Sequence, residues 1–124
     1  MITAKTFRLD GQLALVTGSS AGIGLALAAG LAQAGAHLVL NGRDPVKLAA
    51  AARSLADQGH TVHTSAFDVT SGDATAVAIQ QIERDVGPIE VLVNNAGIQR
   101  RAPFQDFPAE QWSELMRTNV DSVF

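Results

Sequence analysis

The sequence contains neither cysteine nor tyrosine among its 124 residues, and it has no long run of charge of either sign. The absence of cysteine excludes disulfides, thiolate metal sites and a thiol nucleophile. Nine basic and twelve acidic residues give a net charge of −3, which disfavours nucleic acid or an anionic membrane as the main partner. We therefore expect a cytoplasmic protein that binds neither nucleic acid nor membrane.

Long hydrophobic runs are also missing. The longest nearly apolar stretch, Ala21 to Ala36, contains four glycines and is too short to span a bilayer. The apolar run near the N-terminus, Leu13 to Val16, is too brief for a secretory signal. Nevertheless 47% of the residues are hydrophobic, and a chain of this size can bury about two-thirds of its unfolded surface. The sequence therefore predicts one domain, residues 1–124, with a well-formed core.

Four short apolar runs alternate with segments of helical periodicity. The runs predict strands over residues 13–17, 37–41, 61–67 and 91–94. Helices are predicted to begin near residues 23, 45, 71 and 108, and the first three are followed by a glycine. Strictly alternating strands and helices form a parallel sheet that is covered on both faces. The predicted fold class is therefore a doubly wound, Rossmann-like α/β fold.

The apolar residues of the first and last helices indicate which sides should pack. In the first helix, one face is formed by Ile23, Leu27, Leu31 and Ala34. In the last helix, the side chains expected to face inward are Trp112, Leu115, Met116 and Val120. The pair His60 and His63 lies at the start of a strand, where the two side chains point to opposite faces, so we expect no metal site.

A glycine-rich segment connects the first predicted strand to the first predicted helix. It reads Gly-x-x-x-Gly-x-Gly from Gly18 to Gly24. Glycine permits a tight turn and lets backbone N–H groups approach a diphosphate, whose charge the helix N-terminus stabilises. The segment predicts a dinucleotide-binding loop formed by Gly18, Ser20, Gly22, Ile23 and Gly24. The alternative is a glycine-rich turn that only lets the helix pack.

A second motif, Asn94-Asn95-Ala96-Gly97, ends the fourth predicted strand. Together the two motifs resemble the short-chain dehydrogenase/reductase family over essentially the whole chain. The resemblance implies that the second motif, with Asn95, Ala96 and Gly97, supports the sheet edge beside the adenosine and the nicotinamide ribose. It also implies that Asp68 and Val69 contact the adenine. The alternative for Asp68 is a carboxylate that caps a helix.

The end of the second predicted strand bears on the choice of dinucleotide. An acid there hydrogen-bonds the 2′-hydroxyl of NAD, and in the family that acid falls at Gly42. Here the acid is absent, and the next residue, Arg43, can pair with a phosphate, which implies NADP. The alternative is a solvated arginine beside Asp44. Ala21 lacks the basic residue that many NADP-dependent members carry, so use of NAD as well stays open.

Two further positions match functional residues of the family. Asn119, twenty-five residues after Asn94, matches the asparagine that holds a water in the catalytic proton relay. The segment Ile98-Gln99-Arg100-Arg101 resembles the gluconate 5-dehydrogenase subfamily, which implies interconversion of D-gluconate and 5-ketogluconate. Arg101 is our candidate for binding the carboxylate of an acidic polyol or keto acid. The alternative for this segment is a loop of solvated charges or a subunit contact.

The remaining catalytic residues of the family are absent from the sequence. The family uses a serine and a Tyr-x-x-x-Lys as its acid–base set. This chain has no tyrosine, and its only lysines are Lys5 and Lys47. The first hypothesis is therefore the cofactor-binding half of an NADP-dependent oxidoreductase, incomplete by itself and a homotetramer at full length by family resemblance. The second is a noncatalytic dinucleotide-binding or interaction module.

Overall fold

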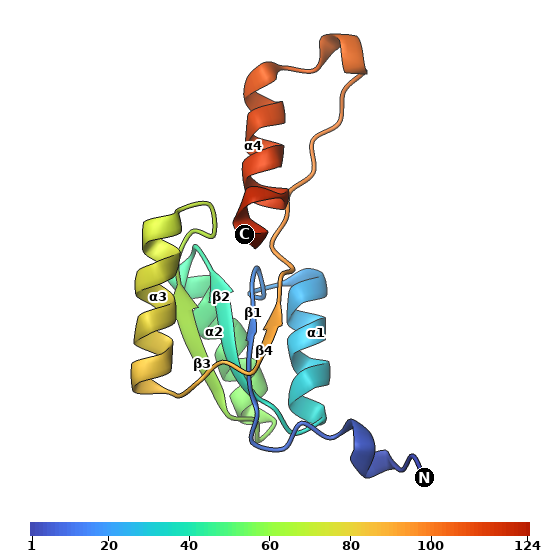
Figure 1. Ribbon diagram of the computed structural model, residues 1–124, viewed down its shortest axis with the longest axis vertical. Helices are drawn as coiled ribbons and strands as arrows, with labels where there is room; N and C mark the ends of the chain where they lie inside the picture. Colours follow the sequence, from blue (N-terminus) through green and yellow to red (C-terminus); the bar gives the residue numbers. More distant parts are fainter.

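Four parallel strands form the centre of the molecule, and the computed structural model describes residues 1–124 (Figure 1). The strands are β1 (Leu13–Val16), β2 (His37–Gly42), β3 (Val62–Ala66) and β4 (Val91–Val93). Their order in the sheet is β3-β2-β1-β4. The chain thus moves outward from β1 to β3 and then crosses back to β4, which creates a switch point beside β1. The predicted parallel α/β fold is confirmed.

Four helices connect or follow the strands: α1 (Gly22–Gln33), α2 (Pro45–Asp57), α3 (Gly72–Asp85) and α4 (Ala109–Asn119). Their bounds lie within about two residues of the prediction, because capping residues mark several of them. Asp44 caps α2 by accepting from the N–H groups of Val46 and Lys47, and Ser71 caps α3 instead of belonging to it. Three short 3-10 turns complete the chain, at Ala4–Phe7, Phe104–Asp106 and Asp121–Val123. None of the helices is long and apolar enough to cross a bilayer.

The inner strands β1 and β2 are largely buried on both faces of the sheet, whereas β3 and β4 are partly exposed. On one face, Ala14 and Val16 of β1 belong to a cluster that also contains buried residues of α1 and α2. On the other face, Leu13 and Leu15 pack with Ile82 of α3. Figure 1 shows α1 and α3 on opposite sides of the sheet. Because successive side chains of a strand point to opposite faces, β1 is apolar at every position.

The packing face of α1 differs from the predicted one. Ile23 is 75% exposed and Leu27 is 43% exposed, whereas the buried residues of α1 are Gly24, Ala28 and Ala32. The helix is apolar around most of its circumference, so its periodicity does not show which side meets the sheet. Small residues on the inner side let the helix backbone lie close to β1 and β2.

The predicted inward face of α4 is wrong for this chain. None of the residues of α4 is buried, and Trp112 is 54% exposed. Figure 1 shows the reason: α4 and the segment before it extend away from the sheet, beyond the carboxyl ends of the strands. The apolar side chains of α4 therefore do not pack against the sheet, although Trp112 makes an edge-to-face contact with Phe107.

The strand β4 lies at an open edge of the sheet. Val91 and Val93 are half-buried against the α1 side, whereas Leu92 is 55% exposed. Leu92 pairs in register with Leu15, whose side of the sheet is covered by α3. That cover does not extend over Leu92, so β4 presents both unpaired backbone groups and an apolar side chain.

Candidate functional site

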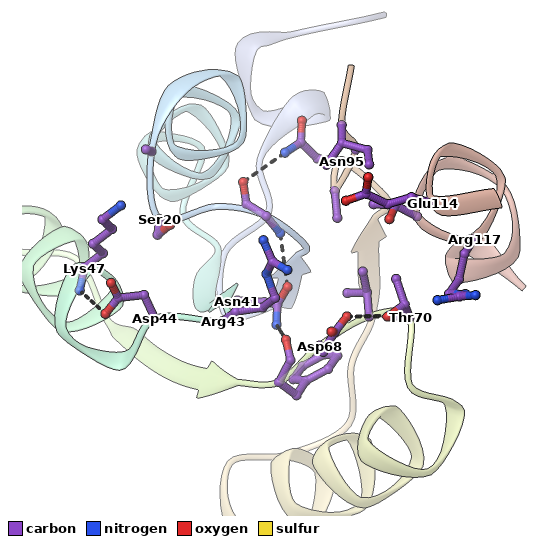
Figure 2. A pocket seen from close by; sticks show the side chains of 18 of the residues that line it. Ser20, Asn41, Arg43, Asp44, Lys47, Asp68, Thr70, Asn95, Glu114 and Arg117 are labelled. Atoms are coloured by element: carbon purple, nitrogen blue, oxygen red, sulfur yellow. Dashed lines mark hydrogen bonds between the residues drawn. The ribbon is translucent and has the colours of Figure 1, made fainter. Parts of the chain in front are cut away.

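A cleft of about 580 Å³ lies over the carboxyl ends of the strands (Figure 2). Its walls come from the turn after β1, the end of β2 with the start of α2, the segment after β3, the segment after β4, and α4. Open parallel sheets bind ligands at this edge, beside the strand where the order reverses. Of the residues predicted for the site, those that line the cleft are Gly18, Ser20, Arg43, Asp68, Val69, Asn95, Ala96 and Gly97.

The turn after β1 presents a row of backbone donors. None of the N–H groups of residues 20–24 donates to an acceptor within the chain, and the first bond of this stretch is from Leu25 N to Ala21 O. Gly18 has a φ of +60°, and a Cβ there would lie 3.0 Å from the Cα of Ala96. Only glycine fits this conformation and this spacing. The turn and the start of α1 therefore form a site suited to an anion. Binding of the cofactor by Gly22, Ile23 and Gly24 stays a prediction.

Asn95 holds this turn from the side of β4. Its Nδ2 donates to the carbonyls of Thr17 at 3.0 Å and Gly18 at 3.1 Å. In return, the hydroxyl of Thr17 accepts from the backbone N–H groups of Asn95 and Ala96 at 3.0 and 2.9 Å. These reciprocal bonds fix the segment after β4 against the turn after β1.

Asp68 lies on the wall that follows β3. Its Oδ1 accepts from Thr70 Oγ1 at 2.7 Å and from Thr70 N at 2.9 Å. These hydrogen bonds lower the pKa of Asp68 below its usual value of 3.8, and the charges of Arg43 and Arg117 act in the same direction. Asp68 is therefore a carboxylate at neutral pH. It lies beside Thr70 in Figure 2, with the side chain of Arg117 reaching toward it from α4.

Among the charged side chains that line the cleft, more cations than anions lack an ion-pair partner. Arg43, Lys47 and Arg117 form no salt bridge, whereas Arg100 pairs with Glu114 at 3.0 Å. Asp44 also lines the cleft, but its carboxylate caps α2. The side of the cleft at the end of β2 therefore offers a guanidinium and an ammonium to a negatively charged ligand.

Five residues predicted for the site lie outside the cleft lining: Gly22, Ile23 and Gly24 at the start of α1, and Arg101 and Asn119. Arg101 points elsewhere: with the Gln99 amide turned so that its oxygen faces Arg101, that oxygen accepts from the guanidinium at 2.9 and 3.1 Å. Asn119 bonds the backbone of Ile98 in both directions, accepting from its N–H at 2.8 Å and donating to its carbonyl at 2.9 Å. In this structure Asn119 attaches α4 to the segment after β4.

Several lining residues were not predicted. Asn41 is the last residue but one of β2, Thr70 lies two residues after Asp68, and Glu114 and Arg117 come from α4. Lys47 could have been found, because it lies in the first turn of α2, four residues after Arg43. The α4 residues could not, because their place depends on how the segment after Gly97 leaves the sheet. No group of three or more histidine, aspartate or glutamate side chains could hold a metal ion.

The parallel sheet with its switch point, the glycine turn before α1 and the cleft at the carboxyl edge are features of the doubly wound, Rossmann-like α/β class. The chain belongs to the short chain dehydrogenase family, whose sequence profile matches residues 12–124. The family resemblance noted in the sequence is thereby confirmed.

Relatives within the family include enzymes named for gluconate chemistry. The gluconate 5-dehydrogenase of Gluconobacter oxydans (strain 621H) is 52% identical over 118 residues, which are 95% of this chain and 46% of that protein. The 5-keto-D-gluconate 5-reductase of Escherichia coli (strain K12) is 42% identical over 118 residues, with the same two coverages. The chain thus spans about half the length of these curated relatives.

A solved structure agrees with this assignment. The crystal structure of a gluconate 5-dehydrogenase from Burkholderia cenocepacia J2315, in complex with NADP and tartrate, superposes with a TM-score of 0.94 at 50% identity. The match covers 98% of this chain and 48% of that one. The fold described above is therefore the fold of about half of that enzyme.

Proposed function

We propose that this chain provides the dinucleotide-binding part of an NADP-dependent oxidoreductase that interconverts D-gluconate and 5-ketogluconate. The observation that carries the proposal is the cleft, which is lined both by Ser20 and Ala21, whose N–H groups have no acceptor within the chain, and by Arg43 and Lys47. A dinucleotide with an additional phosphate needs both an anion-binding turn and cations at the end of β2. The names of the relatives support the choice of substrate.

The proposed cofactor preference depends on what is missing at the end of β2. Position 42 is a glycine, and a side chain there would begin 3.3 Å from Ser20 Oγ. With no carboxylate at position 42, a 2′-phosphate is not repelled from this position and can accept from Arg43 and Lys47. Ser20, Arg43 and Lys47 thus offer a hydroxyl group and two positive charges to the 2′-phosphate, although position 21 has no basic side chain.

In the proposed enzyme each predicted residue has one task, and Arg101 and Asn119 are among the residues that lie outside the cleft lining. The N–H groups of residues 20–24 bind the diphosphate, and Asp68 and Val69 bind the adenine. Asn95, Ala96 and Gly97 shape the side next to the nicotinamide ribose, Arg101 binds the substrate carboxylate, and Asn119 orders the relay. NADP supplies the hydride acceptor. The acid–base pair must come from residues outside these 124, because the chain has no tyrosine. The proposal also includes a cytoplasmic location and a homotetrameric full-length protein.

Titration of NADPH and NADH onto the protein expressed from its complete reading frame tests the cofactor assignment. Arg43→Ala should weaken NADPH binding roughly 10- to 150-fold, which corresponds to about 1.5–3 kcal/mol for a hydrogen bond to a charged group. NADH binding should not change. Arg53→Ala, an exposed arginine of α2 outside the cleft lining, is the matched control and should bind both dinucleotides as the wild type does. Equal weakening of both by Arg43→Ala contradicts the assignment.

A noncatalytic dinucleotide-binding module is the second candidate, and the absence of tyrosine favours it. The two candidates differ in what the reading frame encodes. The intact mass of the natural protein and the nucleotide sequence after codon 124 distinguish them: a Tyr-x-x-x-Lys downstream supports the oxidoreductase, and a stop codon at that point supports the module.

A further inference from the structure

Gly18, at the start of the turn after β1, is held from two sides by asparagine side chains. Asn95 Nδ2 donates to the Gly18 carbonyl at 3.1 Å, and Asn41 Oδ1 accepts from the Gly18 N–H at 3.1 Å. Both bonds are drawn in Figure 2. Asn95 belongs to the motif that ends β4, but Asn41 belongs to neither of the motifs that mark the family. The role of Asn41 therefore has to be read from its contacts.

Asn41 is 1% exposed, although it is polar. Its Nδ2 donates to the carbonyls of Ser65 and Phe67, both at 3.2 Å, at the end of β3. Its backbone N–H donates to Ser19 Oγ at 2.9 Å, and its carbonyl accepts from Ser19 N at 2.8 Å. A single buried residue thus links the turn after β1 to the segment that leads directly into Asp68.

An apolar residue at this position would leave buried groups without partners. The N–H of Gly18 and the carbonyl of Phe67 would each lose the side-chain partner they have here. The same bonds also keep the N–H of Gly18 occupied within the protein. Donors for a ligand diphosphate therefore come from residues 20–24, whose direction depends on how Gly18 is held.

We propose that Asn41 is a positioning residue of the nucleotide cleft, which sets the anion-binding turn and the wall at Asp68 in a fixed relation before ligand binds. The inference rests on the proposed function for its ligand, but the hydrogen bonds that carry it are independent of that ligand. A turn that is ordered before binding loses less conformational entropy when the ligand binds. Loss of the Asn41 side chain should therefore weaken dinucleotide binding in addition to any loss of stability.

Binding of NADPH to the protein from its complete reading frame is the first test. Asn41→Ala should raise the Kd about tenfold or more, equivalent to about 1.4 kcal/mol. Leu55→Ala, a buried α2 residue in the same core, should lower the free energy of unfolding but keep the Kd within about twofold, because it makes no contact with the turn. An Asn41→Ala Kd within about twofold of the wild type, or an equal loss in Leu55→Ala, overturns the inference.

A double-mutant cycle tests whether the two asparagines act on the same turn. If both hold Gly18, Asn41→Ala and Asn95→Ala together should weaken NADPH binding by less than the product of the single effects, because the second removal acts on a turn that is already loose. Effects that multiply in the double variant show independent sites and contradict a shared role.

Amide hydrogen exchange at Gly18, followed by NMR, is a readout that needs no ligand. Exchange should be about tenfold or more faster in Asn41→Ala than in the wild type, because the acceptor Oδ1 is lost. Unchanged exchange in Asn41→Ala refutes the positioning role, even if NADPH binds. If the wild type binds neither NADPH nor NADH, the proposed function fails while this measurement still decides the role of Asn41.

Discussion

Replacing Gly24 by alanine should displace the turn after β1 and so disturb the cleft. Gly24 is buried in the first turn of α1, and an added Cβ would come closer than 3 Å to the Gly18 carbonyl oxygen and to 2.5 Å from Asn95 Nδ2. These two atoms are hydrogen-bonded to each other at 3.1 Å. The methyl group therefore has to separate them, and the turn after β1 has to move.

The size of the effect follows from three contributions. Overpacking of this kind costs about 1–3 kcal/mol, and loss of the Asn95–Gly18 hydrogen bond costs about 1 kcal/mol. Alanine gains about 0.5–1 kcal/mol over glycine within a helix. We therefore expect Gly24→Ala to lower the free energy of unfolding by about 1–3 kcal/mol.

Gly30 offers a matched control in the same helix. A Cβ at Gly30 would have no other atom within 4 Å, so Gly30→Ala should stabilise the protein by about 0.5–1 kcal/mol. Urea denaturation of both variants gives the two signs, and NADPH titration shows whether Gly24→Ala also weakens binding. The reasoning is refuted if both substitutions stabilise the protein, or if Gly24→Ala matches the wild type in stability and NADPH affinity.

Four further predictions can be tested directly. Arg101→Ala should raise the KM for gluconate and leave NADPH affinity unchanged; equal wild-type turnover of gluconate and an uncharged polyol of the same length would contradict the substrate proposal. Thr70→Val removes the hydroxyl that bonds Asp68, so the pKa of Asp68 should rise toward 3.8 in an NMR titration. Because the pKa of Asp68 is lower in the folded protein, its carboxylate stabilises the fold above pH 3.8, and this stabilisation is lost as the pH falls through the folded pKa. The unfolding free energies of the wild type and Thr70→Val should therefore converge at low pH. The 124-residue chain by itself should lack the rate contribution of about 10² to 10⁴ from general acid–base catalysis. It should also self-associate through the open β4 edge, and Leu92→Lys should reduce this self-association in sedimentation experiments.

The helices and strands could be predicted from the sequence, because capping residues and glycines mark the ends of the helices. Asp44 and Pro45 begin α2, and Gly35 and Gly59 follow the ends of α1 and α2. The alternation of strands and helices then leaves few topologies, since parallel crossovers have one hand. The packing side of α1 was not predictable, because Ile23 and Leu27 are as apolar as the small residues that face the sheet.

Part of the candidate site was also predictable. Gly18, Arg43, Asp68 and Asn95 all follow the ends of strands, and the carboxyl ends of parallel strands meet at one edge. The pairings within the site were not predictable. Asn41 bonds groups more than twenty residues away on two other strand ends, so its role appears only when the register of the sheet is known.

The helix α4 forms one wall of the cleft but buries none of its residues. Among the bonds that hold it are the two between Asn119 and Ile98 and the exposed ion pair between Arg100 and Glu114, and such contacts contribute little against local opening. The sheet and the glycine turn, by contrast, are tied into the core. The cleft thus combines a floor packed into the core with a wall held by a few exposed polar contacts. A ligand that contacts Arg117 or Thr118 as well as the glycine turn would join this wall to the floor, so its binding free energy would add to the stability of the α4 position.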